Sequence, residues 1–307
     1  SFPMMLGNLF QQFYTMADSA IVGRFVSEKA LAAVGASYAL TNIFICIAIG
    51  GGIGSSVIVS RYFGSKNYKK MNSALSTAML SFLFISIFLG GIGLLFCKNI
   101  MILLNTPEDT LDMAVVYLNI YFIGLPFLFM YNIISSMFNA LGKSKIPLYF
   151  LIFSSILNVF LDLFMVSTLN MGVAGAAWAT LISQGTAAIA SFVVLKKLLI
   201  QFTIEKDSVF SKDEFLNMFK IALPSILQQS IVSIGMMLVQ SVINSFGSGA
   251  LAGFSAAMRI ESICVVPMAA IGNAVSSFAA QNIGADEKER VVQGYHAANA
   301  MAAVCGL

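Results

Sequence analysis

The chain has 307 residues, of which 58% are hydrophobic and only 10% are charged. Soluble globular proteins average about 45–50% apolar and about 25% charged residues, so this composition excludes an ordinary soluble domain and indicates a protein embedded in a lipid bilayer. The net charge of +3 does not indicate a nucleic-acid partner, because the basic residues are scattered over short loops and form no continuous basic surface.

Long apolar stretches follow one another along the chain, separated by short polar joints. A membrane-spanning helix needs roughly 20 mostly apolar residues. In chain order the sequence predicts spans over Phe2–Val22, Ala30–Tyr62, Ser73–Cys97, Thr110–Leu141, Ile146–Leu169, Val173–Leu199, Phe215–Phe246, Ala250–Asn282 and Val291–Leu307. Strands of a membrane β-barrel alternate between polar and apolar residues, whereas Leu80–Leu95 and Leu148–Leu163 are apolar on every face. We therefore predict an all-α integral membrane protein with eight or nine helices in this chain.

Both ends of the chain lack features expected of a complete membrane protein. The first residue is Ser rather than Met, and the last apolar stretch stops at Leu307 without a polar flank. We therefore expect that this sequence is cut at both ends and that further helices lie outside it.

The basic residues of the joints are distributed unevenly between the two sides of the predicted bundle. The joints after the second, fourth, sixth and eighth spans hold Lys66, Lys69, Lys70, Lys143, Lys145, Lys196, Lys197, Lys206, Lys212, Lys220, Lys288 and Arg290. The remaining joints hold only Arg24, Lys29 and Lys98. Because cytoplasmic loops of membrane proteins carry an excess of Lys and Arg, we predict that the first group of joints and the N-terminus are cytoplasmic.

The chain resembles itself at an offset of about 220 residues, which indicates an internal repeat. The segment 30–32 matches 250–252, and Gly52, Ser56 and Gly64 fall on Gly272, Ser276 and Gly284. Six spans separate the matching positions, so both copies enter the membrane from the same side, as in the parallel repeats of many secondary transporters. We predict an N-terminal lobe over residues 1–200, a cytoplasmic linker over 201–214 and a truncated C-terminal lobe over 215–307, with six helices per lobe in the whole protein.

The second span contains a run of glycines, Gly50, Gly51, Gly52 and Gly54. They resemble a phosphate-binding loop only superficially, because no strand precedes them and no Lys-Ser/Thr follows them. Small residues instead let membrane helices approach each other closely. The sequence therefore predicts a close helix contact or a bend at this point.

Three acidic residues lie well inside predicted spans, namely Asp18, Asp162 and Glu261. An ionisable group at membrane depth costs roughly 2.5–3.5 kcal/mol on insertion scales and commonly marks an ion or substrate pathway. Asp18 follows Pro3 by 15 residues, and Asp162 follows Pro147 by the same number, on helices that start at the same side. At ~1.5 Å per residue, both acids are predicted ~22 Å into the membrane.

Two further polar residues are predicted at the same level. The sixth span runs in the opposite direction, and Thr180, seven residues after Val173, falls ~10 Å below the outer surface. Asn158 precedes Asp162 by one helical turn and shares its face. These oxygens suit a small hard cation, and two buried carboxylates can also hold a proton between them. The alternative is that Asp18 and Asp162 only join helices through hydrogen bonds.

The third acid, Glu261, is predicted ~16 Å into the eighth span. Arg259 is two residues away and therefore not on the same face of the helix. An ion pair with a neighbouring helix and a role in substrate binding are both open for these two residues.

The sequence offers no arrangement for enzymatic catalysis or for a bound cofactor. His296, the single histidine, falls in the first turn or so of the last span, where no partners are spaced for a metal site. The four cysteines have no CxxC spacing and indicate neither a disulfide framework nor a zinc site. We predict that the protein is not an enzyme and binds no cofactor.

These residues resemble the multidrug and toxic compound extrusion (MATE) transporters over essentially the whole chain. The matching segments are Tyr14–Gly23 around Asp18, Asn158–Asp162, Gly175–Thr180, Arg259–Glu261 and Gln281–Ala285. The resemblance points to the prokaryotic DinF-type branch, in which the N-terminal lobe carries the coupling cation. It implies a two-lobe bundle of 6+6 helices in which this cation, H⁺ or Na⁺, binds Asp18, Asn158, Asp162 and Thr180.

One position departs from the family pattern. The acid that another branch carries in the seventh helix has no counterpart here, where Gln228, Gln229 and Val232 occupy the region. Coupling through an acid of that helix is therefore not predicted.

The resemblance implies a monomeric antiporter of the bacterial inner membrane that exports amphiphilic, often cationic, small molecules by alternating access. Its expected partners are these substrates and membrane lipid. The nearest alternative is a flippase for lipid-linked sugars, which needs several basic residues in its cavity, whereas Arg259 is the only basic residue deep in a predicted span. A receptor or channel without coupled transport is the second alternative.

Overall fold

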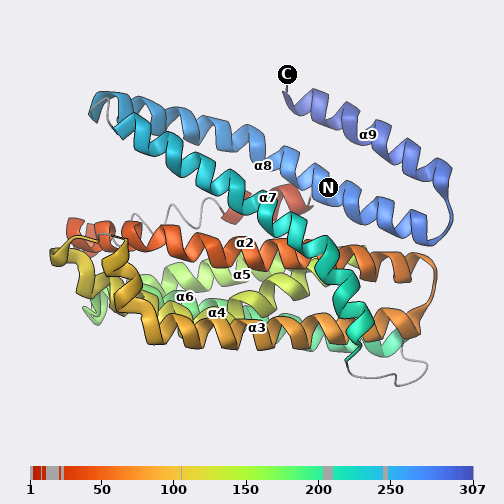
Figure 1. The fold of residues 1–307 in the computed structure, drawn as a ribbon, viewed down its shortest axis with the longest axis horizontal. Coiled ribbons are helices and arrows are strands. Elements are labelled where there is room, and N and C mark those ends of the chain that lie inside the picture. Colours follow the sequence, from red (N-terminus) through yellow and green to blue (C-terminus); the bar gives the residue numbers. More distant parts are fainter. Residues whose placement is uncertain are drawn as a thin grey trace.

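The protein, seen in a computed structural model, is built from long α-helices that form two groups (Figure 1). The structure describes residues 3–7, 9–11, 21, 24–104, 106–202, 210–244 and 248–306. Within these ranges there is no β-strand, and the prediction of an all-α fold is confirmed.

The helices follow the predicted spans. The first lobe contains α2 (Glu28–Gly64), α3 (Tyr68–Leu103), α4 (Glu108–Ala140), α5 (Lys145–Asp162), a π-helical segment (Leu163–Thr168), α6 (Gly172–Leu199) and a short 3₁₀ turn (Ile200–Phe202). The second lobe contains α7 (Lys212–Asn244), α8 (Ser248–Gly284) and α9 (Lys288–Gly306). α7 begins inside the stretch 201–214 that was predicted as a linker, and the lobe boundaries stay a prediction.

Five helical stretches in the described part of the chain are long and apolar enough to cross a membrane. They are Leu40–Gly64, Tyr68–Leu103, Glu108–Ala140, Lys145–Thr168 and Gly172–Phe202. Of the predicted first span, only residues 3–7, 9–11 and 21 are described, and all of them are helical.

Polar side chains cap the first two complete helices. Ser27 Oγ accepts a hydrogen bond from Ala30 N at 3.1 Å, and Asn67 Oδ1 accepts one from Lys70 N at 3.1 Å. Such caps satisfy backbone N–H groups that have no partner inside the helix. The cap at Asn67 lies in the three-residue joint after Gly64 and fixes the point at which the chain turns back into α3.

The internal repeat extends to the backbone of the turns after α2 and α8. Lys66 and Asp286, which are 220 residues apart, both have a positive φ, 57° and 58°. In each turn, three successive N–H groups donate to the same relative carbonyls of the preceding helix. A left-handed residue of this kind is a common way to end a helix. The two lobes therefore repeat a local structure as well as a sequence pattern.

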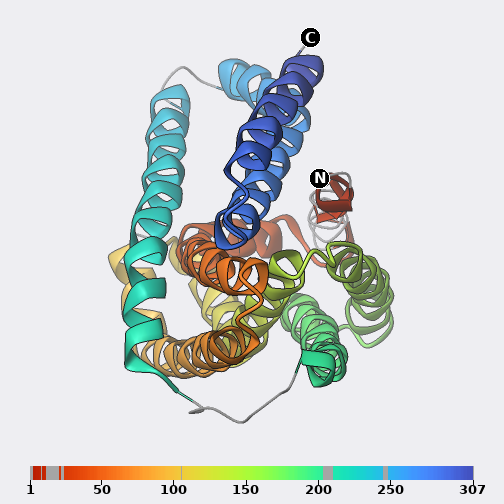
Figure 2. The ribbon, with the colours of Figure 1, turned by 90° about the vertical axis from the view of Figure 1, so that its right-hand side faces the viewer.

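α4 is the centre of the first lobe and lies between α2, α3 and α6 (Figure 2). Its fully buried large side chains are Leu118, Phe122, Leu125, Phe129, Ile133, Ile134, Met137 and Phe138. α3 instead exposes Phe84, Phe88 and Leu95, whose side chains are 81%, 65% and 78% exposed. An apolar surface of this size marks a face that contacts lipid or another protein, and in a membrane protein lipid is the expected neighbour.

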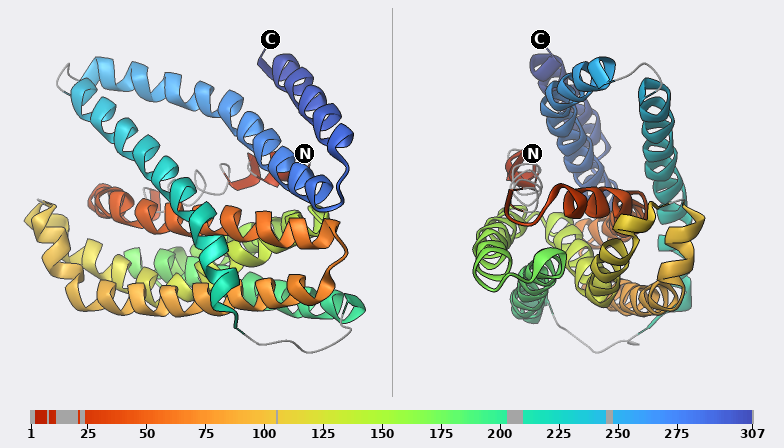
Figure 3. Two further views of the ribbon diagram at one scale, coloured as in Figure 1. Left: turned by 45° about the vertical axis from the view of Figure 1, so that its right-hand side comes forward. Right: turned by 90° about the vertical axis from the view of Figure 1, so that its left-hand side faces the viewer.

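The two lobes meet at one end of the molecule and diverge at the other (Figures 1 and 3). The joints 65–67, 141–144, 210–211 and 285–287 all lie at the end where the lobes meet. We call it the basic end, because Lys66 and Lys143 lie in these joints and Lys288 follows the last of them directly. α2 packs on both α7 and α8, whereas α7 and α8 turn away from the first lobe towards the opposite end.

The glycines of α2 allow the close contact that the sequence predicted. A Cβ on Gly50 would lie 2.7 Å from Ile226 N, and a Cβ on Gly54 would lie 2.7 Å from Ala222 N. Both neighbours are backbone atoms of α7, which cannot move aside as a flexible side chain can. The prediction of a close helix contact at these glycines is confirmed.

Candidate functional site

Asp162 lies where α5 changes from a regular α-helix into a π-helical segment. α5 ends at Asp162, and the π-helical segment covers Leu163–Thr168. The sequence predicted one uninterrupted span over Ile146–Leu169. π-helical turns are rare and frequently occur at functional sites. The irregular geometry therefore begins at one of the residues that the sequence singled out.

Asn158, Asp162 and Thr180 form a polar cluster between α5 and α6. Asn158 and Asp162 are fully buried, with 0% of their surface exposed. Asn158 Nδ2 donates a hydrogen bond to Thr180 Oγ1 at 3.2 Å, and Asp162 follows Asn158 by one turn on the same helix face. The structure thus brings together three of the four predicted residues. The fourth, Asp18, lies outside the described residues.

The donor atoms of this cluster are oxygens. Asn158 Oδ1 is buried and accepts no hydrogen bond from the part of the chain that the structure describes. Because buried polar atoms are nearly always paired with protein or ordered water, this oxygen is suited to bind a water molecule or an ion. With Thr180 Oγ1 and the Asp162 carboxylate, it makes a set that a hard cation prefers. The described residues contain no group of three or more His, Cys, Asp or Glu placed to hold a metal.

Two small cavities lie in this region of the protein, and one of them reaches the cluster. The first, about 20 Å³, reaches Thr180 and is bordered by Tyr117, Tyr121 and Gln184. The second, about 50 Å³, is also bordered by Gln184. A water molecule needs about 10–15 Å³ of this kind of space, so the cavities can hold one and several waters respectively.

A larger cavity, about 410 Å³, lies between the two lobes. We call it the interlobe cavity; it shares Gln11, Tyr131 and Asn132 with the second small cavity. The second lobe contributes Gln229, Ala269, Ala270, Asn273, Ser276 and Ser277 to its wall. Its volume lies within the range of small-molecule sites, about 300–1,000 Å³. Amides, hydroxyls and apolar side chains alternate in the described wall, a mixture that suits an amphiphilic ligand.

The residues between the cluster and the interlobe cavity were missed in the sequence. The prediction of functional residues rested on ionisable groups, whereas Gln184, Tyr131 and Asn132 carry no charge. A signal was available, because Thr180, Ser183 and Gln184 recur at the spacing of one helix face in α6. Neutral polar residues at helical spacing inside a span would have pointed to the same region.

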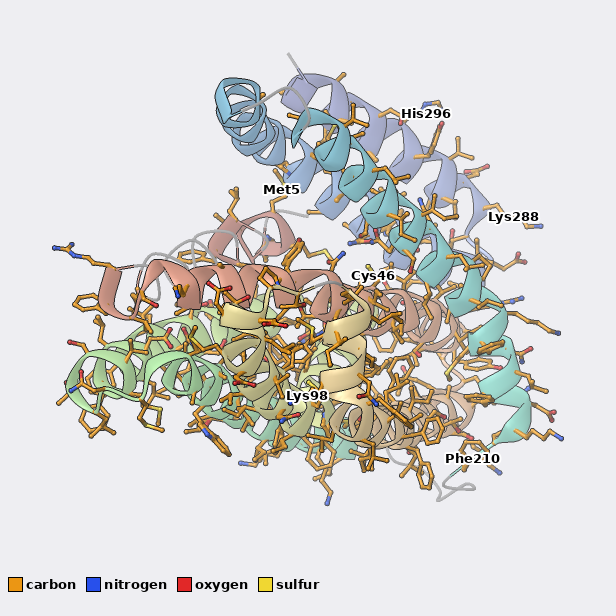
Figure 4. The ribbon with its side chains drawn as sticks, turned by 60° about the vertical axis from the view of Figure 1, so that its left-hand side comes forward. Met5, Cys46, Lys98, Phe210, Lys288 and His296 are labelled. Atoms are coloured by element: carbon orange, nitrogen blue, oxygen red, sulfur yellow. The ribbon has the colours of Figure 1, made fainter. Side chains whose placement is uncertain are left out.

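The other residues that were discussed as candidates from the sequence do not belong to α5 or α6. Arg259 and Glu261 belong to α8, but their side chains are outside the described part of the structure, and the choice between an ion pair and substrate binding stays open. His296 lies on α9, and Cys46 lies where α2 meets α7 (Figure 4). Cys46 is a buried free thiol, and its Sγ lies 3.6 Å from Ser233 Oγ.

Two helical lobes around a polar cavity, with buried oxygens inside one lobe, are typical of a polytopic membrane transporter. The MatE family model matches residues 3–164 and 224–307. The chain therefore belongs to the MatE family, which consists of transporters and not of enzymes. The narrower DinF-type assignment stays a prediction.

Similar proteins support this classification. The chain is 36% identical over 292 residues to the probable multidrug resistance protein YpnP of Bacillus subtilis (strain 168), covering 95% of this chain and 65% of YpnP. It is 31% identical over 303 residues to the probable multidrug resistance protein YoeA of the same strain, with the same two coverages. The chain thus spans about 65% of the length of these relatives.

The fold is similar to that of solved MATE structures. One of them, described as the outward-facing conformation of a multidrug resistance MATE family transporter of the MOP superfamily, has a TM-score of 0.92 to this chain. The similarity covers 99% of this chain and 68% of the solved chain at 24% sequence identity. The arrangement of the two lobes is therefore that of this fold.

Proposed function

We propose that the protein is an antiporter that exports amphiphilic small molecules and is driven by H⁺ or Na⁺. The observation that carries the proposal is the Asn158, Asp162 and Thr180 cluster, which is buried in the first lobe. One small cavity reaches Thr180, and a second, which shares Gln184 with the first, adjoins the interlobe cavity. A buried ionisable group at membrane depth commonly belongs to an ion pathway. The similarity to two probable multidrug resistance proteins supports export of drug-like compounds.

In the proposed orientation, the basic end faces the cytoplasm of the bacterial inner membrane. Cytoplasmic loops carry the excess of Lys and Arg, and the joints of this end hold most of the basic residues. The lobes are then closed towards the cytoplasm and apart towards the outside. The similarity to an outward-facing structure supports this assignment of the state.

The ion acts at the Asp162 carboxylate in this proposal. A proton neutralises Asp162, whereas a sodium ion is held by the carboxylate together with Asn158 Oδ1 and Thr180 Oγ1. Asp18 completes the site. Coupling requires that the ion and the substrate favour different states of the protein. Gln184 borders both small cavities, and the second of them shares Tyr131 and Asn132 with the interlobe cavity, so these side chains are the proposed link between the ion and the substrate.

A transport assay with the full-length protein in proteoliposomes tests the proposal. Efflux of a fluorescent cationic dye is followed after an ion gradient is imposed. With Asp162→Asn, we expect efflux to fall to the rate of protein-free liposomes, because the side chain can no longer exchange a proton or neutralise a cation. With Thr180→Val, we expect weaker ion dependence, seen as a higher ion concentration for half-maximal efflux.

The matched control is Thr186→Val on the same helix, α6. Thr186 is exposed and donates only to the Ile182 carbonyl of its own helix, so we expect normal efflux. Unchanged ion-driven efflux in Asp162→Asn would overturn the coupling proposal. Imposing a proton gradient and a sodium gradient separately identifies the ion.

The flippase alternative predicts a different cavity. A lipid pyrophosphate needs cationic side chains around it, whereas the described wall of the interlobe cavity contains amides, hydroxyls and apolar groups. Export of amphiphiles is therefore the function that this wall supports better.

A further inference from the structure

The last turns of α2 and α8 cross at the basic end with their backbones in contact (Figures 1 and 3). A Cβ on Gly64 of α2 would overlap the Gln281 carbonyl oxygen and lie 2.9 Å from Gln281 Cα. A Cβ on Gly284 of α8 would overlap the Arg61 carbonyl oxygen and lie 3.1 Å from Arg61 Cα. Only glycine fits at both positions while the helices keep this distance.

The crossing is reciprocal. Gly64 and Gly284 are equivalent positions of the repeat, and so are Arg61 and Gln281, each pair being 220 residues apart. Gly64 therefore faces the carbonyl of Gln281, three residues before Gly284. In the same way, Gly284 faces the carbonyl of Arg61, three residues before Gly64. A contact in which both partners use the same surface is isologous, as in a two-fold symmetric dimer. The crossing thus lies on the axis that relates the two lobes.

The tight fit is specific to the contact and is not a general property of glycine in these helices. A Cβ on Gly35 of α2 or on Gly272 of α8 would meet nothing within 4 Å. Gly64 and Gly284 therefore differ from Gly35 and Gly272 of the same two helices in what lies opposite them.

A third helix end takes part in the crossing. Gln281 Nε2 of the second lobe donates to the Ala140 carbonyl at 2.6 Å, and Ser60 Oγ of the first lobe donates to the same oxygen at 3.4 Å. The last carbonyls of a helix have no partner inside it, so the end of α4 can accept both donors. One oxygen atom is thus hydrogen-bonded from both lobes beside the crossing.

The crossing lies beyond the floor of the interlobe cavity. Ser56 and Ser276, a further equivalent pair, both border that cavity. Each of them precedes its crossing glycine by eight residues, which is ~12 Å along a helix. The backbone contact therefore lies between the α2–α8 side of the cavity and the basic end, while Asn139 and Ser144 border the cavity where α4 ends.

We propose that Gly64 and Gly284 form the gate that closes the interlobe cavity at the basic end, and that the absence of a Cβ at both positions sets how fully this gate shuts. The inference rests on the proposed function, because alternating access requires the contact to form and break in each cycle. A Cβ at either glycine prevents the last approach of the lobes. The equilibrium then shifts towards the state that is open at the basic end.

The accessibility of the cavity from the cytoplasmic side tests the gate. All cysteines of the full-length protein, among them Cys46, Cys97, Cys264 and Cys305, are first replaced by Ala, and Ser276→Cys then supplies a single reporter in the cavity wall. Its reaction with a membrane-impermeant maleimide is measured in inside-out vesicles. With Gly64→Ala or Gly284→Ala, we expect the labelling rate to rise about tenfold, the change that ~1.4 kcal/mol produces.

The control is Gly272→Ala, which adds the same methyl group to α8 where the space is open. We expect its labelling rate to equal that of the parent protein. Equal rates for Gly64→Ala, Gly284→Ala and Gly272→Ala would overturn the inference. If the glycine variants do not insert into the membrane, Gln281→Leu replaces them, because it removes the hydrogen bond to the Ala140 carbonyl without adding a Cβ. For this variant we expect a smaller rise in the labelling rate, of about threefold. An unchanged labelling rate in Gln281→Leu counts against the gate.

The labelling experiment tests the gate independently of the efflux experiment, because labelling requires no ion gradient and no transport. If Asp162→Asn transports normally while the glycine variants label faster, the gate stands and ion coupling through Asp162 fails. If Asp162→Asn loses transport while the glycine variants label at the parent rate, coupling stands and the gate fails.

Discussion

The two halves of α2 differ in how closely other helices pack against them. Towards the basic end, Gly50, Gly54 and Gly64 let the backbones of α7 and α8 come into contact with α2. Towards the opposite end, Tyr38 and Ile43 leave 60% and 49% of their surface exposed. At these positions, glycines occur where α2 touches the second lobe, and large side chains stay exposed towards the other end.

The same contrast is present on α7. Near the basic end, the backbone at Ala222 and Ile226 lies against the glycines of α2. Near the opposite end, Leu238 and Val242 are 65% and 59% exposed. The difference between the two ends is therefore a property of the interface between the lobes and not of α2 alone.

The largest effect is expected from filling the contact half of α2. Gly54→Leu places a branched side chain where even a Cβ would lie 2.7 Å from Ala222 N. Overpacking of this kind typically costs about 1–3 kcal/mol and can exceed that, so we expect a marked fall in the yield and thermal stability of the folded protein in detergent. Gly35→Leu, on the open side of the same helix, should have little effect. Equal stability of the two variants would show that the contact at Gly54 relaxes freely.

An intermediate effect is expected from the polar contact at the start of α7. Glu214 is buried, with 7% of its surface exposed, and its Oε1 accepts a hydrogen bond from Tyr62 Oη of α2 at 2.9 Å. Its Oε2 accepts no hydrogen bond from the residues that the structure covers. Tyr62→Phe removes the one donor seen on this carboxyl, and leaving a buried polar group unpaired costs about 1–3 kcal/mol.

We expect Tyr62→Phe to lower thermal stability and to raise the labelling rate of the Ser276→Cys reporter from the cytoplasmic side. Tyr149→Phe on α5 is the control, because Tyr149 is 65% exposed. Identical melting temperatures for the two variants would contradict a stabilising role of the Tyr62 contact with Glu214.

The smallest effect is expected in the open half of α2. Tyr38→Ala removes a side chain that is 60% exposed, and substitutions of exposed residues usually change stability by less than about 0.5 kcal/mol. Thermal stability of the full-length protein should stay at the parent value. A clear loss of stability would mean that Tyr38 contacts another part of the folded protein and that the two halves of α2 differ less than we infer.

The candidate site could be predicted in part, because its residues are related by helical spacing. Asn158 and Asp162 are one turn apart, and Thr180 was placed at a similar depth by counting residues from the start of its span. The structure adds the hydrogen bond between Asn158 and Thr180, while the role of the site and the position of Asp18 stay predictions. The π-helical segment after Asp162 was not predicted, because its sequence, Leu163–Thr168, is as apolar as a regular span.

The sequence by itself determined that this chain is a helical membrane protein with a parallel repeat. These are local properties, since long apolar runs require backbone hydrogen bonds within each segment and matching positions recur at a constant offset. The tertiary structure decided which small residues matter, because Gly64 and Gly272 are both glycines in apolar helices and differ only in what lies opposite. It also decided where the cavities lie, because a wall built from both lobes depends on how distant helices pack and not on any one segment.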